Sequence, residues 1–179
     1  MKHINITATD PKAYCLAIQL YSDIFAEAYD IAREALDDLL GSVAETEFTK
    51  EDIANVLAAK IIAKWTGDNN ITKHQHDLWS WHRLKKGWTF GILKTDFAKT
   101  DPCLKHFSLL TKEEAARDRI ITELFDETVG DVYLVNCYVV DASGEVSVLV
   151  DTFGFTSEEE ARKFMKEDTI YDRLRLEKF

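Results

Sequence analysis

The chain has 179 residues, of which 46% are hydrophobic and 30% charged, enough for one core of ordinary size with or without a small satellite domain. The net charge of -10 argues against binding to long nucleic acid. No segment approaches the ~18 apolar residues of a membrane helix or has a signal-peptide pattern, so we expect no membrane partner. The widely spaced Cys15, Cys103 and Cys137 are read as free thiols, and we expect a cytoplasmic protein.

The first expected element is a long amphipathic helix. Asp10 and Pro11 form a typical helix start, and apolar residues recur at helical spacing until Gly41. A helix over most of residues 11–40 is long for a small domain. We therefore expect that it is either bent or packed against a second copy of the chain.

Three further helices are expected before residue 126. Thr49 caps a helix that ends near Gly67, a third helix runs from about 71 to 86, and a fourth begins with the capping box at residues 111–114. On the third helix His76, Trp79 and Arg83 share one stripe. Between the third and fourth helices lies a short aromatic segment, residues 87–91, bounded by glycines.

The pattern changes from helical to extended after Gly130. Residues 132–140 and 146–150 are rich in β-branched residues and flank a turn at 141–144, which predicts a hairpin. Residues 156–159 open a short helix, and the alternation at residues 173–176 indicates a last strand. We therefore expect a ββαβ element at the C-terminal end.

The segment from about Phe48 to Phe125 resembles a ryanodine-receptor (RyR) domain. Three motifs follow the family pattern in order: HDLWSWHRLKKGWTFG, then the D, K and DPCL of DFAKTDPCL, then EEAARDR. Phe90 and Phe107 stand where the family usually has tyrosine, and Asp101 where it has histidine. The residues that match are His76, Trp79, Arg83, Gly87, Trp88, Gly91, Asp96, Lys99, Pro102, Cys103, Leu104, Asp118 and Arg119.

The resemblance implies a mostly helical module. Together with the elements above it predicts an α+β chain with three parts: an N-terminal helix in 1–47, an RyR-like helical domain in 48–129 and the ββαβ subdomain in 130–179. In eukaryotic ryanodine receptors such units occur in pairs, one of which has a cleft associated with adenine nucleotides. Single bacterial and phage copies are suspected of sensing nucleotides or other small signals, and the family is not known for catalysis.

A small anionic ligand, such as a nucleotide, fits the charge distribution. Residues 73–125 carry a net +3, whereas residues 1–72 carry -6 and residues 126–179 carry -7. An indole face accepts a purine ring, and arginine offers a forked donor to phosphate. The candidate ligand-binding residues are His76, Trp79, Arg83, Trp88, Phe90, Cys103, Leu104 and Arg119.

A purely structural interpretation of the same residues stays open. In it Trp79 is a core aromatic, His76 caps a loop and Arg83 pairs with an acid such as Asp118. In both interpretations we expect no catalytic residue, metal or cofactor, because the histidines of the third helix point to different sides and Cys103 has no supporting motif.

The leading hypothesis is thus a non-enzymatic ligand-binding or sensing module. The alternative is a protein–protein interaction or oligomeric scaffold protein with no small-molecule ligand, in which the RyR-like unit is a rigid body. In that case the N-terminal helix is the expected contact of a homodimer.

Overall fold

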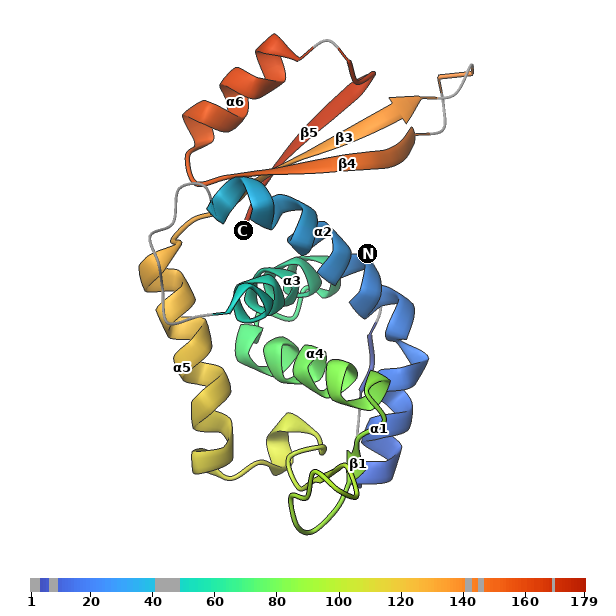
Figure 1. Cartoon of the computed structure of the whole chain (residues 1–179). Coiled ribbons are helices and arrows are strands. Elements are labelled where there is room, and N and C mark those ends of the chain that lie inside the picture. Colours follow the sequence, from blue (N-terminus) through green and yellow to red (C-terminus); the bar gives the residue numbers. More distant parts are fainter. Residues whose placement is uncertain (1–3, 7–9, 41–48, 141–142, 145–146, 169) are drawn as a thin grey trace.

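The computed structural model describes residues 4–6, 10–40, 49–140, 143–144, 147–168 and 170–179 (Figure 1). It confirms the expected α+β class: a helical body is joined to a small sheet with one helix of its own. The helices of the body are α1 (Pro11–Leu20), α2 (Ser22–Leu40), α3 (Lys50–Thr66), α4 (Ile71–Lys85), the short 3-10 helix η1 (Phe107–Leu109) and α5 (Lys112–Thr128). The C-terminal part contains β3 (Tyr133–Val140), β4 (Ser147–Phe155), α6 (Glu158–Glu167) and β5 (Arg173–Lys178). No helix in the described residues is both long and apolar enough to cross a membrane.

The long N-terminal helix is bent. It divides at Tyr21, whose φ of -95° and ψ of 16° end α1, and α2 starts at the next residue. Ser22 accepts a hydrogen bond from Trp81 Nε1 at 2.8 Å, so a contact from α4 coincides with the break. Phe25 is fully buried in the chain's own core, while Leu16 and Leu20 of α1 remain exposed. The apolar face of α2 is therefore used within a single chain.

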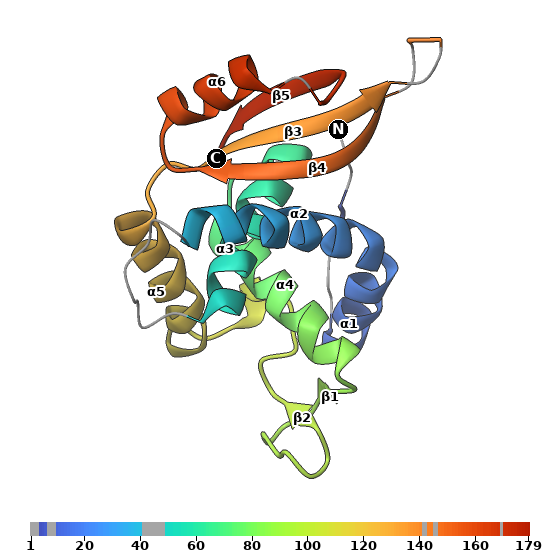
Figure 2. The same ribbon diagram turned by 45° about the horizontal axis from the view of Figure 1, so that its top comes forward.

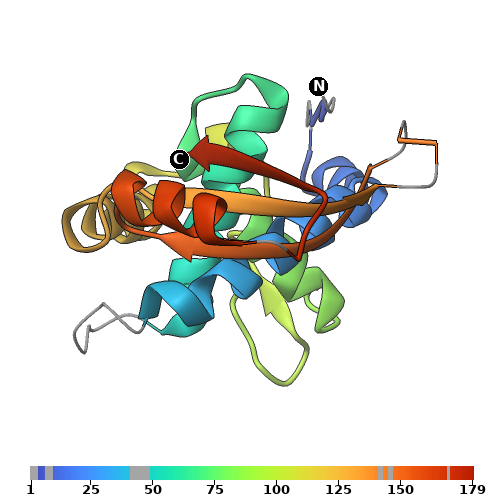
Figure 3. The ribbon, with the colours of Figure 1, turned by 90° about the horizontal axis from the view of Figure 1, so that it is seen from above.

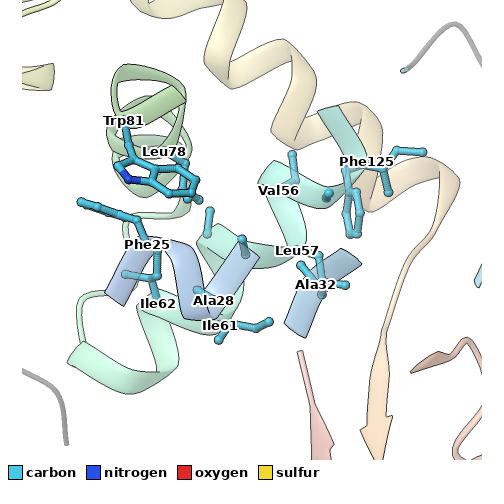
Figure 4. Packing of buried hydrophobic residues seen from close by; sticks show 14 of the residues in the cluster. Phe25, Ala28, Ala32, Val56, Leu57, Ile61, Ile62, Leu78, Trp81 and Phe125 are labelled. Carbon is cyan, nitrogen blue, oxygen red and sulfur yellow. The ribbon is translucent and has the colours of Figure 1, made fainter. Parts of the chain in front are cut away.

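Helix α3 is the centre of the core. It is buried on most sides by α2, α4 and α5, which explains why its sequence is a nearly continuous apolar run rather than a single stripe. Figure 4 shows its side chains between those of the three neighbouring helices. The packed residues include Phe25, Ala28 and Ala32 of α2, Val56, Leu57, Ile61 and Ile62 of α3, Leu78 and Trp81 of α4, and Phe125 of α5.

The C-terminal ββαβ element forms as expected. The strand order is β4-β3-β5, with both pairings antiparallel, and α6 lies across one face of the sheet (Figure 3). The hairpin between β3 and β4 is confirmed, although part of its expected turn, residues 141–142, lies outside the described residues. Val132 and Leu134 join the main core, so the sheet packs onto the helical body through its other face.

Residues 91–100 form a projecting loop, here called the finger, at the end of the molecule opposite the sheet (Figure 2). Its base is a two-stranded parallel pair of β1 (Thr89–Phe90) and β2 (Thr100–Asp101). Thr95 and Thr100 exchange backbone hydrogen bonds of 3.0 Å, and Thr100 Oγ1 donates to the Leu93 carbonyl at 2.8 Å. Gly91 is required here, because a Cβ on it would lie 2.6 Å from the Cβ of Thr100. The finger is therefore internally braced.

The position of α3 predicts a large difference between two leucine substitutions. Leu57→Ala in α3 removes a fully buried side chain and should lower the free energy of unfolding by about 2 to 5 kcal/mol, since it leaves a cavity. Leu20→Ala in α1, where the side chain is 78% exposed, should change it by less than about 0.5 kcal/mol. Urea denaturation of both variants measures the difference, and equal losses would contradict this description of the core.

Candidate functional site

A pocket of about 140 Å³ lies between α4, α5 and the segment that joins the finger to η1. Helix α4 contributes its inner wall, because the stripe expected on that helix faces α5 and the loop. The lining residues are His76, Trp79, Lys94, Asp101, Pro102, Cys103, Glu114, Arg117 and Asp118.

His76 is fixed at the base of this pocket by both ring nitrogens. Nδ1 lies 3.0 Å from an Asp118 carboxylate oxygen and Nε2 lies 2.9 Å from the Lys105 carbonyl oxygen. Because both partners are acceptors, both nitrogens must carry a proton to satisfy them, which makes the ring an imidazolium. Burial lowers the pKa of His76, but the hydrogen bond and the charge of Asp118 outweigh it, so that the pKa is raised overall.

Aromatic rings stack on both sides of His76. The centre of the Tyr14 ring lies 6.1 Å from that of His76, with 20° between the ring planes. The centre of the Trp79 ring lies 5.5 Å from that of His76, with 26° between the planes. Tyr14 Oη donates to Asp77 at 2.8 Å and lies 3.0 Å from Ser80 Oγ. Burial raises the pKa of Asp77 to about 6. Helix α1 thus contributes a side chain that supports the pocket from behind.

The side chain of Arg83 extends the stack beyond Trp79. Its guanidinium carbon lies 5.4 Å from the centre of the Trp79 ring and 4.4 Å from that of Trp88. The backbone N–H of Trp88 donates to the Arg83 carbonyl at 3.0 Å, which fixes the turn that brings the second indole over the arginine. Within the described residues the guanidinium makes no hydrogen bond or ion pair.

The carboxylates of the pocket are all engaged, whereas one of its cations is not. Glu114 pairs with Lys105 at 2.9 Å, and Asp118 binds His76. Asp101 accepts the Cys103 N–H at 2.9 Å and lies 4.0 Å from Lys94. Arg117 has no polar partner in the described part of the chain. The unpaired charge at this site is therefore positive.

The structure brings five of the eight candidate ligand-binding residues together. His76, Trp79 and Cys103 line the pocket, and Arg83 and Trp88 adjoin it through Trp79. The other three lie elsewhere. Phe90 is on β1 beside α1, Leu104 is fully buried, and Arg119 is exposed and pairs with Glu123 at 3.6 Å.

The structural interpretation of Arg83 needs one correction. Asp118 does not pair with Arg83; it pairs with His76, because α5 presents the carboxylate to the base of the pocket rather than to its rim. His76 does hold a loop, since it binds the Lys105 carbonyl. For His76, the structural and the ligand-binding interpretations are thus compatible.

The candidate set from the sequence lacks six of the residues that line the pocket: Lys94, Asp101, Pro102, Glu114, Arg117 and Asp118. Three of them lie on α5 at positions i, i+3 and i+4, the spacing that places side chains on one face of a helix. That spacing is visible in EEAARDR and would have selected Arg117 over Arg119. Lys94 is brought to the pocket by the finger and Asp101 by β2 at its base, and neither segment has a periodic pattern. Within the described residues no group of three or more His, Cys, Asp or Glu side chains could hold a metal.

The charged state of His76 predicts a pH dependence of stability. A raised pKa in the folded state gives stability that is complete below the unfolded value of about 6.5 and is lost as the pH rises through the folded value. His74, His82 and His106 have lowered pKa values in the folded state, so they contribute stability that rises with pH until their unfolded forms are neutral, about one pH unit above 6.5. Their contribution opposes that of His76 over the same range. The contribution of His76 is therefore measured as the difference in free energy of unfolding between the wild type and a variant without this histidine. This difference should fall as the pH rises above 6.5, by at most about 1.4 kcal/mol per pH unit.

Urea denaturation of the wild type and of His76→Gln between about pH 6.5 and 8 measures this fall. The stability difference between the wild type and His106→Gln, by contrast, should not fall over the same window, because the pKa of His106 is lowered in the folded state. A difference between the wild type and His76→Gln that stays constant or grows with pH would contradict a charged His76.

Comparison with known proteins connects this geometry to a family. Residues 52–139 match the RyR domain, from the first turn of α3 through α4, the finger and α5 into β3, beyond the boundary expected at residue 129. No solved structure matches the chain significantly. The segment that carries the pocket is the matched segment, and the chain contains an RyR domain at residues 52–139.

Proposed function

We propose that this protein is a non-enzymatic binding module whose RyR domain takes up a small anionic ligand, such as a nucleotide, in the pocket bordered by Trp79 and Arg83. The observation that carries the proposal is the Arg83 guanidinium, which lies over two indole rings and has no polar partner in the described residues. Cytoplasmic location is part of the same proposal.

The stack holds the arginine in a state suited to an anion. The indole faces stabilise the cation and restrict its rotamers, but they leave the N–H groups at the edge of the guanidinium plane available. Less conformational entropy is then lost when an anion binds, because the side chain is already ordered. Arg117, which is also without a polar partner in the described residues, adds a second positive charge to the pocket.

The size of the pocket restricts how a nucleotide can bind. At about 140 Å³ it is smaller than the about 300 to 1,000 Å³ that encloses a drug-sized molecule. A phosphate or one edge of a base fits inside, and the rest of the ligand lies on the Trp79–Arg83 surface. Phe107, whose ring lies 6.0 Å from that of His76, offers no hydroxyl, so specificity here depends on the arginines and the indole faces.

The chemistry of the pocket supports binding rather than catalysis. Both nitrogens of His76 are occupied by protein acceptors, which leaves no ring nitrogen to take a proton from a substrate. Burial and the neighbouring acids Asp101 and Glu114 raise the pKa of Cys103 to about 11, so that it is a thiol and a poor nucleophile at neutral pH.

The test is a thermal-shift and calorimetric screen of adenine and guanine nucleotides. At least one should raise the Tm of the wild type. Arg83→Met keeps an apolar stem beside the indoles but removes the charge-assisted hydrogen bonds, and should weaken binding roughly 10- to 100-fold.

Arg119→Met on α5 is the matched control, because it removes an exposed arginine outside the pocket and should leave affinity unchanged. The proposal fails if no nucleotide stabilises the wild type, or if Arg83→Met binds as tightly as the wild type does.

The interaction-protein alternative also has an observation in its favour. Three apolar side chains of the finger are open to solvent: Ile92 at 87%, Leu93 at 72% and Phe97 at 103% exposure. A braced loop that presents several large apolar side chains is typical of a protein contact. The expected homodimer through the N-terminal helix is proposed on a smaller surface, because Leu16 and Leu20 are the strongly exposed large apolar residues among those of that helix whose side chains the structure describes.

Light scattering over a range of protein concentrations tests self-association through the finger. If the finger mediates it, the wild-type mass should rise with concentration, and Phe97→Ser should abolish the rise. Ile170→Ser, which changes an apolar residue that is 82% exposed in the C-terminal part, should not. A wild-type protein that stays monomeric at every concentration would rule out self-association through the finger.

A further inference from the structure

A second cleft lies between the sheet and the helical body, away from the RyR pocket. It measures about 270 Å³ and is bordered by α2 and α3 on one side and by all three strands of the sheet on the other. Leu134 of β3 is fully buried in the main core, whereas Tyr138, four residues further along the strand, is only half-buried. The sheet is thus closely packed at one end and leaves space toward the other.

One wall of this cleft is apolar and partly aromatic. Ile31 of α2 and Ile61 and Trp65 of α3 form the helical wall, and Leu149 and Phe179 face them from the sheet. Such surface takes up a flat or branched hydrocarbon group of modest size.

Asn136 places an unused donor in the cleft. It is only 9% exposed, and its Oδ1 accepts a hydrogen bond from Thr152 Oγ1 at 3.1 Å. Within the described residues its Nδ2 has no hydrogen-bond partner. This atom is not fully enclosed by the protein. The amide therefore reaches open space in the cleft it lines. An amide donor that is open to the cleft and not used by the protein is available to an acceptor group of a ligand.

Two further donors stand beside Asn136. Arg175 Nε lies 3.0 Å from a Glu177 carboxylate oxygen, but its terminal nitrogens make no hydrogen bond in the described part of the chain. The Tyr138 hydroxyl is likewise without a partner there. The cleft also contains two carboxylates, and both are engaged: Glu177 pairs with Lys64 at 3.4 Å as well as with Arg175, and Glu27 has a partner of its own.

From this arrangement we propose that the cleft binds a small monocarboxylate with an apolar body. The carboxylate accepts from Asn136 and Arg175, and the apolar body lies on Trp65 and Phe179. An amide, a guanidinium and a phenol at one edge of an apolar space match an acceptor-only anion. The inference is independent of the nucleotide proposal, since it uses a different cavity and different residues.

The experiment is an NMR titration at pH 7 with 4-phenylbutanoate and, separately, 4-phenylbutan-1-ol, which has the same body without the charge. 4-Phenylbutanoate should shift the Asn136 side-chain amide and the Trp65 indole signals, and should bind at least roughly tenfold more tightly than the alcohol. Arg175→Met should reduce its affinity by a similar factor. Tyr138→Phe, which removes only a hydroxyl, is a second variant that should also weaken binding.

Arg162→Met on α6 and Arg83→Met in the RyR pocket are the controls, and both should bind 4-phenylbutanoate as the wild type does. The proposal is overturned if neither compound shifts Asn136 and Trp65, if the two bind equally, or if Arg175→Met and Tyr138→Phe both keep full affinity. Loss of 4-phenylbutanoate binding in Arg83→Met would show instead that the probe occupies the RyR pocket.

Discussion

The candidate site depends on one buried ion pair, between the His76 imidazolium and the Asp118 carboxylate, at 3.0 Å. With the bond from His76 to the Lys105 carbonyl, it ties α4 to α5 and to the segment before η1, which together enclose the pocket. Removing one partner of such a pair leaves an uncompensated buried charge and costs about 3 to 5 kcal/mol. The same ring orders Trp79 by stacking, and Trp79 in turn supports Arg83. The buried charge of His76 thus helps to position, through Trp79, the charge of Arg83.

The RyR domain of this chain is supported by residues outside the matched segment. Tyr14 of α1 stacks on the far side of His76 and binds Asp77, and Phe25 and Ala28 of α2 fill the core beside α3. At its C-terminal end the matched segment itself enters the sheet, and its residues Val132 and Leu134 join the same core. The N-terminal helices and the sheet are therefore part of the packing that holds α4 and α5 in place, so a change in their position would reach the pocket.

Local signals in the sequence were sufficient for most elements, but not for the contacts between them. Thr49 caps α3 and the capping box at Thr111 forms, both as expected, and the alternation after Gly130 predicted the hairpin. The bend at Tyr21 is not predicted by a proline or glycine. It coincides with the hydrogen bond between Ser22 and Trp81. Likewise, no pattern showed that Asp118 would meet His76 rather than Arg83.

The central claim is that His76 is doubly protonated at neutral pH, and NMR of its ring nitrogens tests this most directly. Both Nδ1–H and Nε2–H should be observed at pH 7, with nitrogen shifts of an imidazolium and slow exchange with water, because both face buried acceptors. Asp118→Asn should return the ring to a single neutral tautomer. A wild-type His76 that is neutral at pH 7, with one nitrogen unprotonated, would contradict the account.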